Sequence, residues 1–307
     1  EPSVSITAPG SPVSSVSRPR GQIPYPPNSL SKHLLDYGTL GPAMSAPIAN
    51  VGSRVVCGLH GAPGAVASPA ARAVNVRGVA ATGLGDSYRC DVGHDEAVIE
   101  GASMVRINGV PAARVGSHTA EGGAVTKGEQ SVRVGGPSFS IPAFVRVEGD
   151  AAFKAKMYRM LFVALQTNSG QLWRESVEST GKKVTIVSAE PLERKDPKAN
   201  RAVARTDPYL KKGRAHHGGY DRNDPRAYDG TGVDSKIYFD PDDDASLFHE
   251  MTHADDMAHG TMDPAMCDNP GGEGWSERVR CSERRAAGLP PYDDPIRYPF
   301  NEQTYRA

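Results

Sequence analysis

Residues 235–253 have the sequence SKIYFDPDDDASLFHEMTH, which predicts a strand, a turn and the start of a helix. The Ile, Tyr and Phe of residues 235–239 favour a strand, and the Asp-Pro run that follows favours a turn. On the helix, His249 and His253 are four residues apart and share one face, so both imidazoles can reach the same ion. Glu250 lies between them and can take a proton from a water bound there. The stretch therefore predicts a catalytic zinc site with Glu250 as general base.

A catalytic zinc needs a third protein ligand, and the sequence offers several candidates. His259 follows the second His by six residues, as in the metzincin pattern. That pattern has Gly where this chain has Asp256, and without the Gly the helix is expected to continue past this point. Asp263 is a second candidate, as in zinc peptidases of the Asp type. A helix expected further downstream adds two glutamates, Glu277 and Glu283.

The composition excludes several classes of protein. A length of 307 residues favours two domains, and a formal net charge of −1 gives no basic excess for binding nucleic acid. No apolar run approaches the roughly 18 residues that a membrane span requires. Four Cys are too few for a disulfide framework at this length. Cys267 and Cys281 could form a bridge or stay reduced.

The first half of the chain contains a Ser- and Pro-rich arm and then a repeat. Residues 1–45 are expected to be a linker or an arm that lies on a partner. Residues 74–81 (VNVRGVAA) match residues 105–113 (VRINGVPAA), and residues 131–136 (SVRVGG) give a shorter third copy. Three copies of loop, strand, turn and strand predict a compact, mainly β body of hairpin repeats with pseudo-threefold symmetry.

Each loop of this repeat carries Cys or His. Cys57 and His60 lie in the first loop, Cys90 and His94 in the second, and His118 in the third. Pseudo-threefold symmetry would bring the three loops to one vertex, where a tetrahedral zinc would stabilise a small, Gly-rich body. Five candidates exist for four ligand positions.

Residues 107–116, INGVPAARVG, resemble the signature of the PAAR-repeat domain, the sharp cone that caps the spike of the type VI secretion system. The similarity covers about 90 residues of a domain expected at 46–142, although residues 80–83 (AATG) depart from the motif in the first copy. The resemblance implies the trimeric VgrG spike protein as partner and a tip zinc held by three His and one Cys. It favours the ligands His60, Cys90, His94 and His118, with Cys57 as the alternative.

The remaining residues, 143–307, are expected to form an α+β domain. Apolar residues at helical spacing predict a helix over 151–166, and a second helix is expected over 170–178. The β-branched segment 183–187 predicts a strand. The polar residues 189–233 are expected to form a long loop or flap.

Several segments of this domain resemble the M91 family of bacterial effector zinc peptidases. They are residues 181–186 (GKKVTI), 247–253 (LFHEMTH), 283–292 (ERRAAGLPPY) and 301–306 (NEQTYR). The similarity covers about 160 residues and implies a zincin-like metallopeptidase fold. It favours Glu283 as the third zinc ligand, on a helix expected to lie within residues 274–289.

Together the two resemblances imply a type VI secretion effector whose PAAR tip delivers a zinc metalloendopeptidase into a target cell. A protein substrate and a cognate immunity protein are the implied partners, and the compartment of action, periplasm or cytosol, stays open. The alternative is a structural tip or adaptor protein with a non-catalytic C-terminal binding domain, and the intact H-E-x-x-H argues against it. A metal nuclease is a third option, but the balanced charge provides no phosphate-binding face. Four candidates exist for the group that stabilises the oxyanion: Tyr292, Tyr298, Tyr305 and Arg306.

Overall fold

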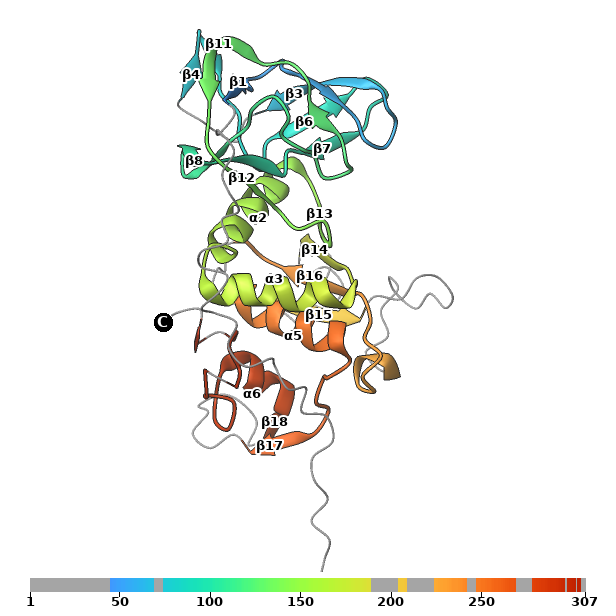
Figure 1. Ribbon diagram of the computed structural model, residues 1–307. Helices are drawn as coiled ribbons and strands as arrows, with labels where there is room; N and C mark the ends of the chain where they lie inside the picture. The colour runs from blue at the N-terminus through green and yellow to red at the C-terminus, as the bar shows by residue number, and fades with distance from the viewer. Residues whose placement is uncertain are drawn as a thin grey trace, which may run out of the picture.

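The computed structural model describes residues 45–68, 74–188, 204–208, 224–241, 247–268, 278–295, 297–301 and 303–304. Short strands make up the N-terminal part, and helices around a second sheet make up the C-terminal part (Figure 1). Several expectations lie outside the described residues: the arm before Ser45, the candidate ligand Glu277, and the candidates Tyr305 and Arg306.

The N-terminal part is strand-rich, as expected. One five-stranded sheet has the order β10-β2-β3-β6-β7, with β2 (Arg54–Val56), β3 (Pro63–Ser68), β6 (Ser87–Cys90), β7 (Asp95–Ala97) and β10 (Ala124–Val125). A three-stranded sheet has the order β12-β8-β9, with β8 (Glu100–Ile107), β9 (Val110–Ala112) and β12 (Ser138–Ser140). Two strand pairs complete it: β1 (Ala46–Ile48) with β11 (Glu129–Val134), and β4 (Asn75–Val76) with β5 (Val79–Ala80).

Two copies of the sequence repeat form matching hairpins. The turn between β4 and β5 is Arg77-Gly78, with φ of 52° and 79°, and the turn between β8 and β9 is Asn108-Gly109, with φ of 49° and 82°. Two consecutive residues with positive φ are typical of a type I′ turn, which explains why Gly recurs at this position. The third, shorter copy lies in β11, which pairs with β1 instead.

The C-terminal part contains a four-stranded mixed sheet of order β13-β14-β16-β15. Its strands are β13 (Val145–Glu148), β14 (Val184–Ser188), β15 (Ala204–Pro208) and β16 (Ser235–Phe239). The expected strands over 183–187 and 235–239 are thus confirmed, and they run parallel to each other. Most of the loop expected over 189–233, residues 189–203 and 209–223, lies outside the described residues. Of the rest, the expectation is wrong at β15, an antiparallel edge strand on β16, and at a 3-10 turn, η1 (Pro225–Ala227). An edge strand obtains its backbone hydrogen bonds from one neighbour, so a polar sequence such as ARTDP gives little sign of it.

Four helices are described: α2 (Ala151–Ala164), α3 (Asn168–Thr180), α5 (Leu247–His259) and α6 (Cys281–Ala287). The side chain of Asp150 caps α2 by accepting a hydrogen bond from the Phe153 amide (2.8 Å). α5 continues past Asp256, as expected in the absence of Gly there. The helix expected within 274–289 begins only at Cys281, because residues 278–280 form β18 and pair with β17 (Met266–Asp268). None of these helices is long and apolar enough to cross a membrane.

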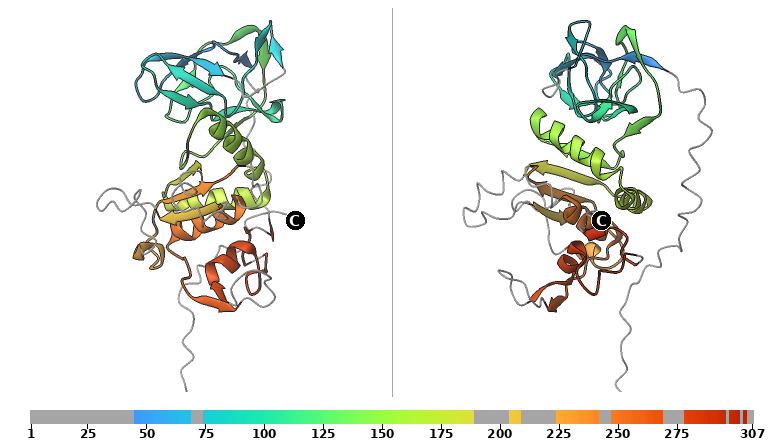
Figure 2. Two further views of the ribbon diagram at one scale, coloured as in Figure 1. Left: turned by 180° about the vertical axis from the view of Figure 1, so that it is seen from behind. Right: turned by 90° about the vertical axis from the view of Figure 1, so that its left-hand side faces the viewer.

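The two parts share one hydrophobic cluster across α2, which lies directly beside the strand-rich part (Figures 1 and 2). Leu84, Ala97 and Val110 of the strand-rich part belong to the same cluster as the α2 residues Met157, Tyr158 and Leu161. We call this interface between α2 and the strand-rich part the joint. A polar contact supports it, since Arg106 Nη2 donates to Gln166 Oε1 at 2.8 Å. The hydrophobic core is therefore continuous on both sides of residue 142, and the domain boundary expected there stays a prediction.

Replacing Leu84 by Ala is expected to lower the free energy of unfolding by about 2–5 kcal/mol, because it removes buried methyl groups and leaves a cavity at this joint. Leu84 is 1% exposed. The matched control is Val163→Ala on α2, where the side chain is 51% exposed, and the expected change is about 0.5 kcal/mol or less. Chemical denaturation of the full chain measures both. If Leu84→Ala lowered the free energy of unfolding no more than Val163→Ala does, packing at the joint would contribute nothing to stability.

Candidate metal centre

Three side chains from α5 and α6 meet at one point. His249 Nε2 lies 3.2 Å from His253 Nε2, and the two nitrogens lie 3.2 and 3.3 Å from Glu283 Oε2. The two histidines come from successive turns of α5, and Glu283 comes from α6. The three residues predicted to bind the catalytic zinc are thus brought together, with Glu283 rather than His259 or Asp263 beside the histidine pair.

The donor atoms are spaced as a metal ion requires. A tetrahedral zinc with bonds of about 2.0–2.1 Å holds its ligand atoms about 3.3–3.4 Å apart. Burial alone would raise the pKa of Glu283, but hydrogen bonds with His249 and His253 outweigh it and hold that pKa well below its usual range. The carboxylate is therefore ionised at neutral pH. Two imidazoles and one carboxylate are a ligand set that suits zinc.

Hydrogen bonds from α3 and within the helix stabilise α5, which carries the two histidines. The Trp173 indole, fully buried on α3, donates to the Met251 carbonyl at 2.7 Å. The Thr252 hydroxyl donates to the Phe248 carbonyl at 3.0 Å. Glu250, directly after His249, is 6% exposed, so the predicted general base lies in a largely dry environment. The Trp173 contact therefore ties α5 to α3, and the Thr252 bond lies within α5 itself.

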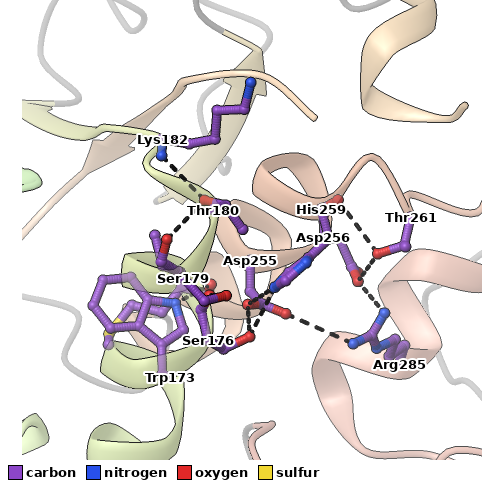
Figure 3. Close-up of polar contacts among 12 residues, drawn as sticks. Trp173, Ser176, Ser179, Thr180, Lys182, Asp255, Asp256, His259, Thr261 and Arg285 are labelled. Atoms are coloured by element: carbon purple, nitrogen blue, oxygen red, sulfur yellow. Dashed lines mark hydrogen bonds and ion pairs between the residues drawn. The ribbon is translucent and has the colours of Figure 1, made fainter. Parts of the chain in front are cut away.

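The other candidates for the third ligand have different partners. His259 Nε2 lies 2.9 Å from Ser176 Oγ and 3.5 Å from Asp255 Oδ1, on the side of α5 that faces α3 (Figure 3). Burial lowers the pKa of His259. Asp263 accepts a hydrogen bond from the Ala265 amide at 2.9 Å. Neither side chain belongs to the group formed by the histidine pair and Glu283.

Sequence reasoning missed two buried acids on α5, Asp255 and Asp256, which are both 0% exposed. Burial raises the pKa of each to about 6, although the positive charge of Arg285 opposes the shift. Asp255 accepts a hydrogen bond from Ser176 Oγ at 2.6 Å, and Asp256 forms an ion pair with Arg285 (Figure 3). The available signal was spacing, since His249, His253 and Asp256 follow the i, i+4, i+7 pattern of one helix face.

The C-terminal aromatic residues pack around α6. The rings of Tyr292 and Tyr298 meet edge to face with centroids 5.2 Å apart, and the Arg285 guanidinium lies 5.8 Å from the centre of the Tyr298 ring. A disulfide joins Cys267 of β17 to Cys281 at the start of α6, two residues before Glu283. This resolves the pairing that the sequence left open, and it ties the helix carrying Glu283 to the β17–β18 hairpin.

A second cluster of Cys and His lies in the strand-rich part. Cys57 Sγ lies 3.6 Å from His60 Nδ1 and 3.7 Å from His94 Nδ1, and Cys90 Sγ lies 3.7 Å from the same nitrogen of His60. Burial raises the pKa of Cys57, but hydrogen bonds led by the one with His94 outweigh it and lower the pKa to about 6. Cys57 is therefore poised to bind a cation as thiolate.

The compact group of possible ligand atoms contains Cys57, His60 and His94, and the expected ligands Cys90 and His118 are not part of it. His118 lies apart from the group that contains Cys57, His60 and His94, and its Nδ1 contacts the Glu100 carboxylate. The His118 side chain is 63% exposed, whereas Cys57 is 0% exposed. The cause is local, because Glu100 on β8 holds the His118 ring at the surface. Cys57, the alternative ligand, lies in that group, and the choice of the four residues that hold a tip zinc stays a prediction.

Comparison with known families agrees with this architecture. A family model of the PAAR motif matches residues 60–127, and the model of the M91 peptidases, described as effector protein, matches residues 142–306. No curated protein matches the chain. The second match covers more than half of the 307 residues. The chain therefore belongs to the M91 peptidase family of effector proteins and carries a PAAR motif ahead of its peptidase-family domain.

Proposed function

We propose that this protein is a type VI secretion effector whose PAAR tip caps the trimeric VgrG spike and whose C-terminal domain is a zinc metalloendopeptidase. The PAAR motif and the M91 effector domain support delivery and a peptidase class. The observation that carries the activity is the triangle of His249 Nε2, His253 Nε2 and Glu283 Oε2, with sides of 3.2–3.3 Å. The substrate is a protein of the target cell.

In this proposal His249, His253 and Glu283 hold the zinc, which when bound supplies Lewis acidity toward water and the peptide carbonyl. Glu250 accepts a proton from the attacking water and passes it to the leaving amine. Glu250 lies one residue after His249 and three residues before His253 on α5, which supports this role by the spacing of the H-E-x-x-H motif. The low exposure of Glu250 strengthens its electrostatic interactions, because little water screens them.

The proposal extends to the whole chain. An arm over 1–45 precedes a pseudo-threefold PAAR cone over 46–142 and a zincin-like domain over 143–307. A structural zinc at the tip is held by Cys57, His60, Cys90 and His94, and an immunity protein protects the producing cell. The Cys267–Cys281 disulfide favours action in an oxidising compartment such as the periplasm, because disulfides are reduced in the cytosol.

Metal analysis tests the two sites together. The purified full chain is expected to hold one zinc at each site, and His253→Ala should lose the catalytic zinc while keeping the tip zinc. Glu283→Ala should weaken the catalytic zinc strongly because it removes a direct ligand. His259→Gln is the control, since His259 contacts α3, and it should keep both. Equal zinc content in the wild type and His253→Ala would contradict the proposed active site.

A further inference from the structure

We propose that Arg285 is a positioning residue that holds Glu283 against the histidine pair by pairing with Asp256 on α5. The inference rests on the proposed function, because it takes Glu283 as a zinc ligand. It assigns a role to the two buried acids that follow the H-E-x-x-H motif and to the arginine two residues after Glu283.

α6 cannot hold Glu283 in place by itself. The helix has seven residues, Cys281–Ala287, and no side chain caps its first turn. An isolated helix of this length is unstable in water, so contacts with the rest of the protein must fix it. Glu283 reaches both histidines through one oxygen atom, Oε2. The disulfide at Cys281 and the hydrogen bonds of Arg284 tie α6 to the β17–β18 hairpin and to Pro290, but they do not set its orientation against α5.

Arg285 provides the second point of contact with α5. Its Nη1 pairs with Asp256 Oδ1, and its Nη2 lies 3.9 Å from Asp255 Oδ2. Asp256 lies on the same helix face as His249 and His253, one turn further along α5. α6 therefore contacts two separate levels of α5, Glu283 at the histidines and Arg285 at the acids. Two contacts fix both the rotation of α6 and its position along the α5 axis.

The acids that receive Arg285 are themselves held rigidly (Figure 3). Asp255 accepts from Ser176 Oγ of α3 at 2.6 Å. Thr261 Oγ1 lies 3.3 Å from Asp256 Oδ1, and the Thr261 amide donates to the Asp256 carbonyl at 2.8 Å. The planar guanidinium of Arg285 thus meets a preformed acceptor, and a planar fork loses little freedom on binding such a site.

A contribution to the stability of the fold does not by itself explain why this ion pair is present. The carboxylates are about 1% exposed and the Arg285 side chain 16% exposed, so both charges lose most of their hydration. Apolar residues of similar size often replace a buried ion pair with no loss of stability. A charge pair does, however, fix a geometry that apolar contacts leave adjustable, and residues behind a metal ligand set its orientation.

The test is a double-mutant cycle on zinc affinity in the full chain, measured by competition with a chromophoric chelator. The His253→Ala variant lacks the catalytic site, so the zinc that it still binds measures the contribution of the tip site. Arg285→Gln is expected to weaken the catalytic zinc by about 10–100-fold. In a Glu283→Gln background the same change should have an effect of about 2-fold or less, because the group that Arg285 positions is already lost. A merely structural arginine would weaken zinc equally in both backgrounds, and that result would overturn the proposal.

Arg284→Gln is the matched control on the same helix. Arg284 is also buried, but it donates to the backbone carbonyls of Asp268 and Pro290 rather than to α5. It should change zinc affinity much less than Arg285→Gln, and an equal loss would overturn the proposal. Should Arg285→Gln fail to fold, Asp256→Asn replaces it in the cycle, since it removes the same ion pair at nearly constant volume.

The cycle separates this inference from the proposed function. Equal zinc binding by the wild type and His253→Ala would overturn both. Zinc binding that His253→Ala abolishes but Arg285→Gln and Asp256→Asn leave unchanged would overturn only the positioning role.

Discussion

Replacing Glu250 by Gln is expected to lower the proposed peptide hydrolysis by about 10²–10⁴-fold while the two proposed zinc ions stay bound. The amide has nearly the same size as the carboxylate, but it cannot accept the proton of the attacking water. Glu250 lies between the two histidines in sequence and is not among the three side chains whose donor atoms meet. The measurement is growth inhibition of target cells by variants expressed at equal levels, together with the zinc content of each purified chain.

Glu175→Gln is the matched control for this variant. Glu175 is an exposed carboxylate on α3, so its loss should leave both toxicity and zinc content unchanged. Full toxicity of the Glu250→Gln variant would rule out the general-base role. Loss of zinc in the same variant would show instead that Glu250 supports the metal, and the mechanism would need another base.

Cys57→Ser is expected to remove the proposed tip zinc and much of the stability of the strand-rich part. A structural zinc contributes about 10–16 kcal/mol to the folded state of a small domain, and a hydroxyl is a poor substitute for a thiolate. The hydrophobic clusters confined to this part are mostly Ala and Val, with Tyr88, Ile48 and Ile107 as the larger members, so they compensate for the loss only in part. Thermal unfolding of the full chain, with and without a chelator, measures the loss.

His118→Ala is the control that separates the two tip assignments. Its ring is exposed and contacts Glu100, so its removal should keep the tip zinc and shift the melting temperature only slightly. The reverse result, in which His118→Ala loses the zinc and Cys57→Ser keeps it, would restore the set expected from the PAAR resemblance.

The parts of the site that sequence predicts are those set by local geometry. The spacing of His249 and His253 places them together in any helix, and the strand before that helix is found at 235–239. Glu283 is different, because it is 30 residues from His253 and a disulfide-linked hairpin lies between them. No spacing rule covers such a connection, so the choice of Glu283 depended on the family resemblance.

The tip shows the same limit. The repeat correctly places Cys and His in successive loops, but it does not say which side chains point inward. That choice depends on Glu100, which lies on a different strand and contacts His118. At Asp256 the sequence alone argued against a metzincin turn, because that pattern has Gly at this position. The ion pair of Asp256 with Arg285, 29 residues further along the chain, is found only in the structure.

The hydrophobic cluster that spans α2 sets a limit on modular exchange. A fragment cut at residue 142 would carry α2 away from Leu84, Ala97 and Val110, leaving Met157, Tyr158 and Leu161 without part of their packing. Grafting the peptidase-family domain onto another carrier would therefore demand a new complementary surface as well as a new linker. Recombination between effectors with this joint should preserve the tip and the enzyme as a pair, so their sequences are expected to change together along lineages.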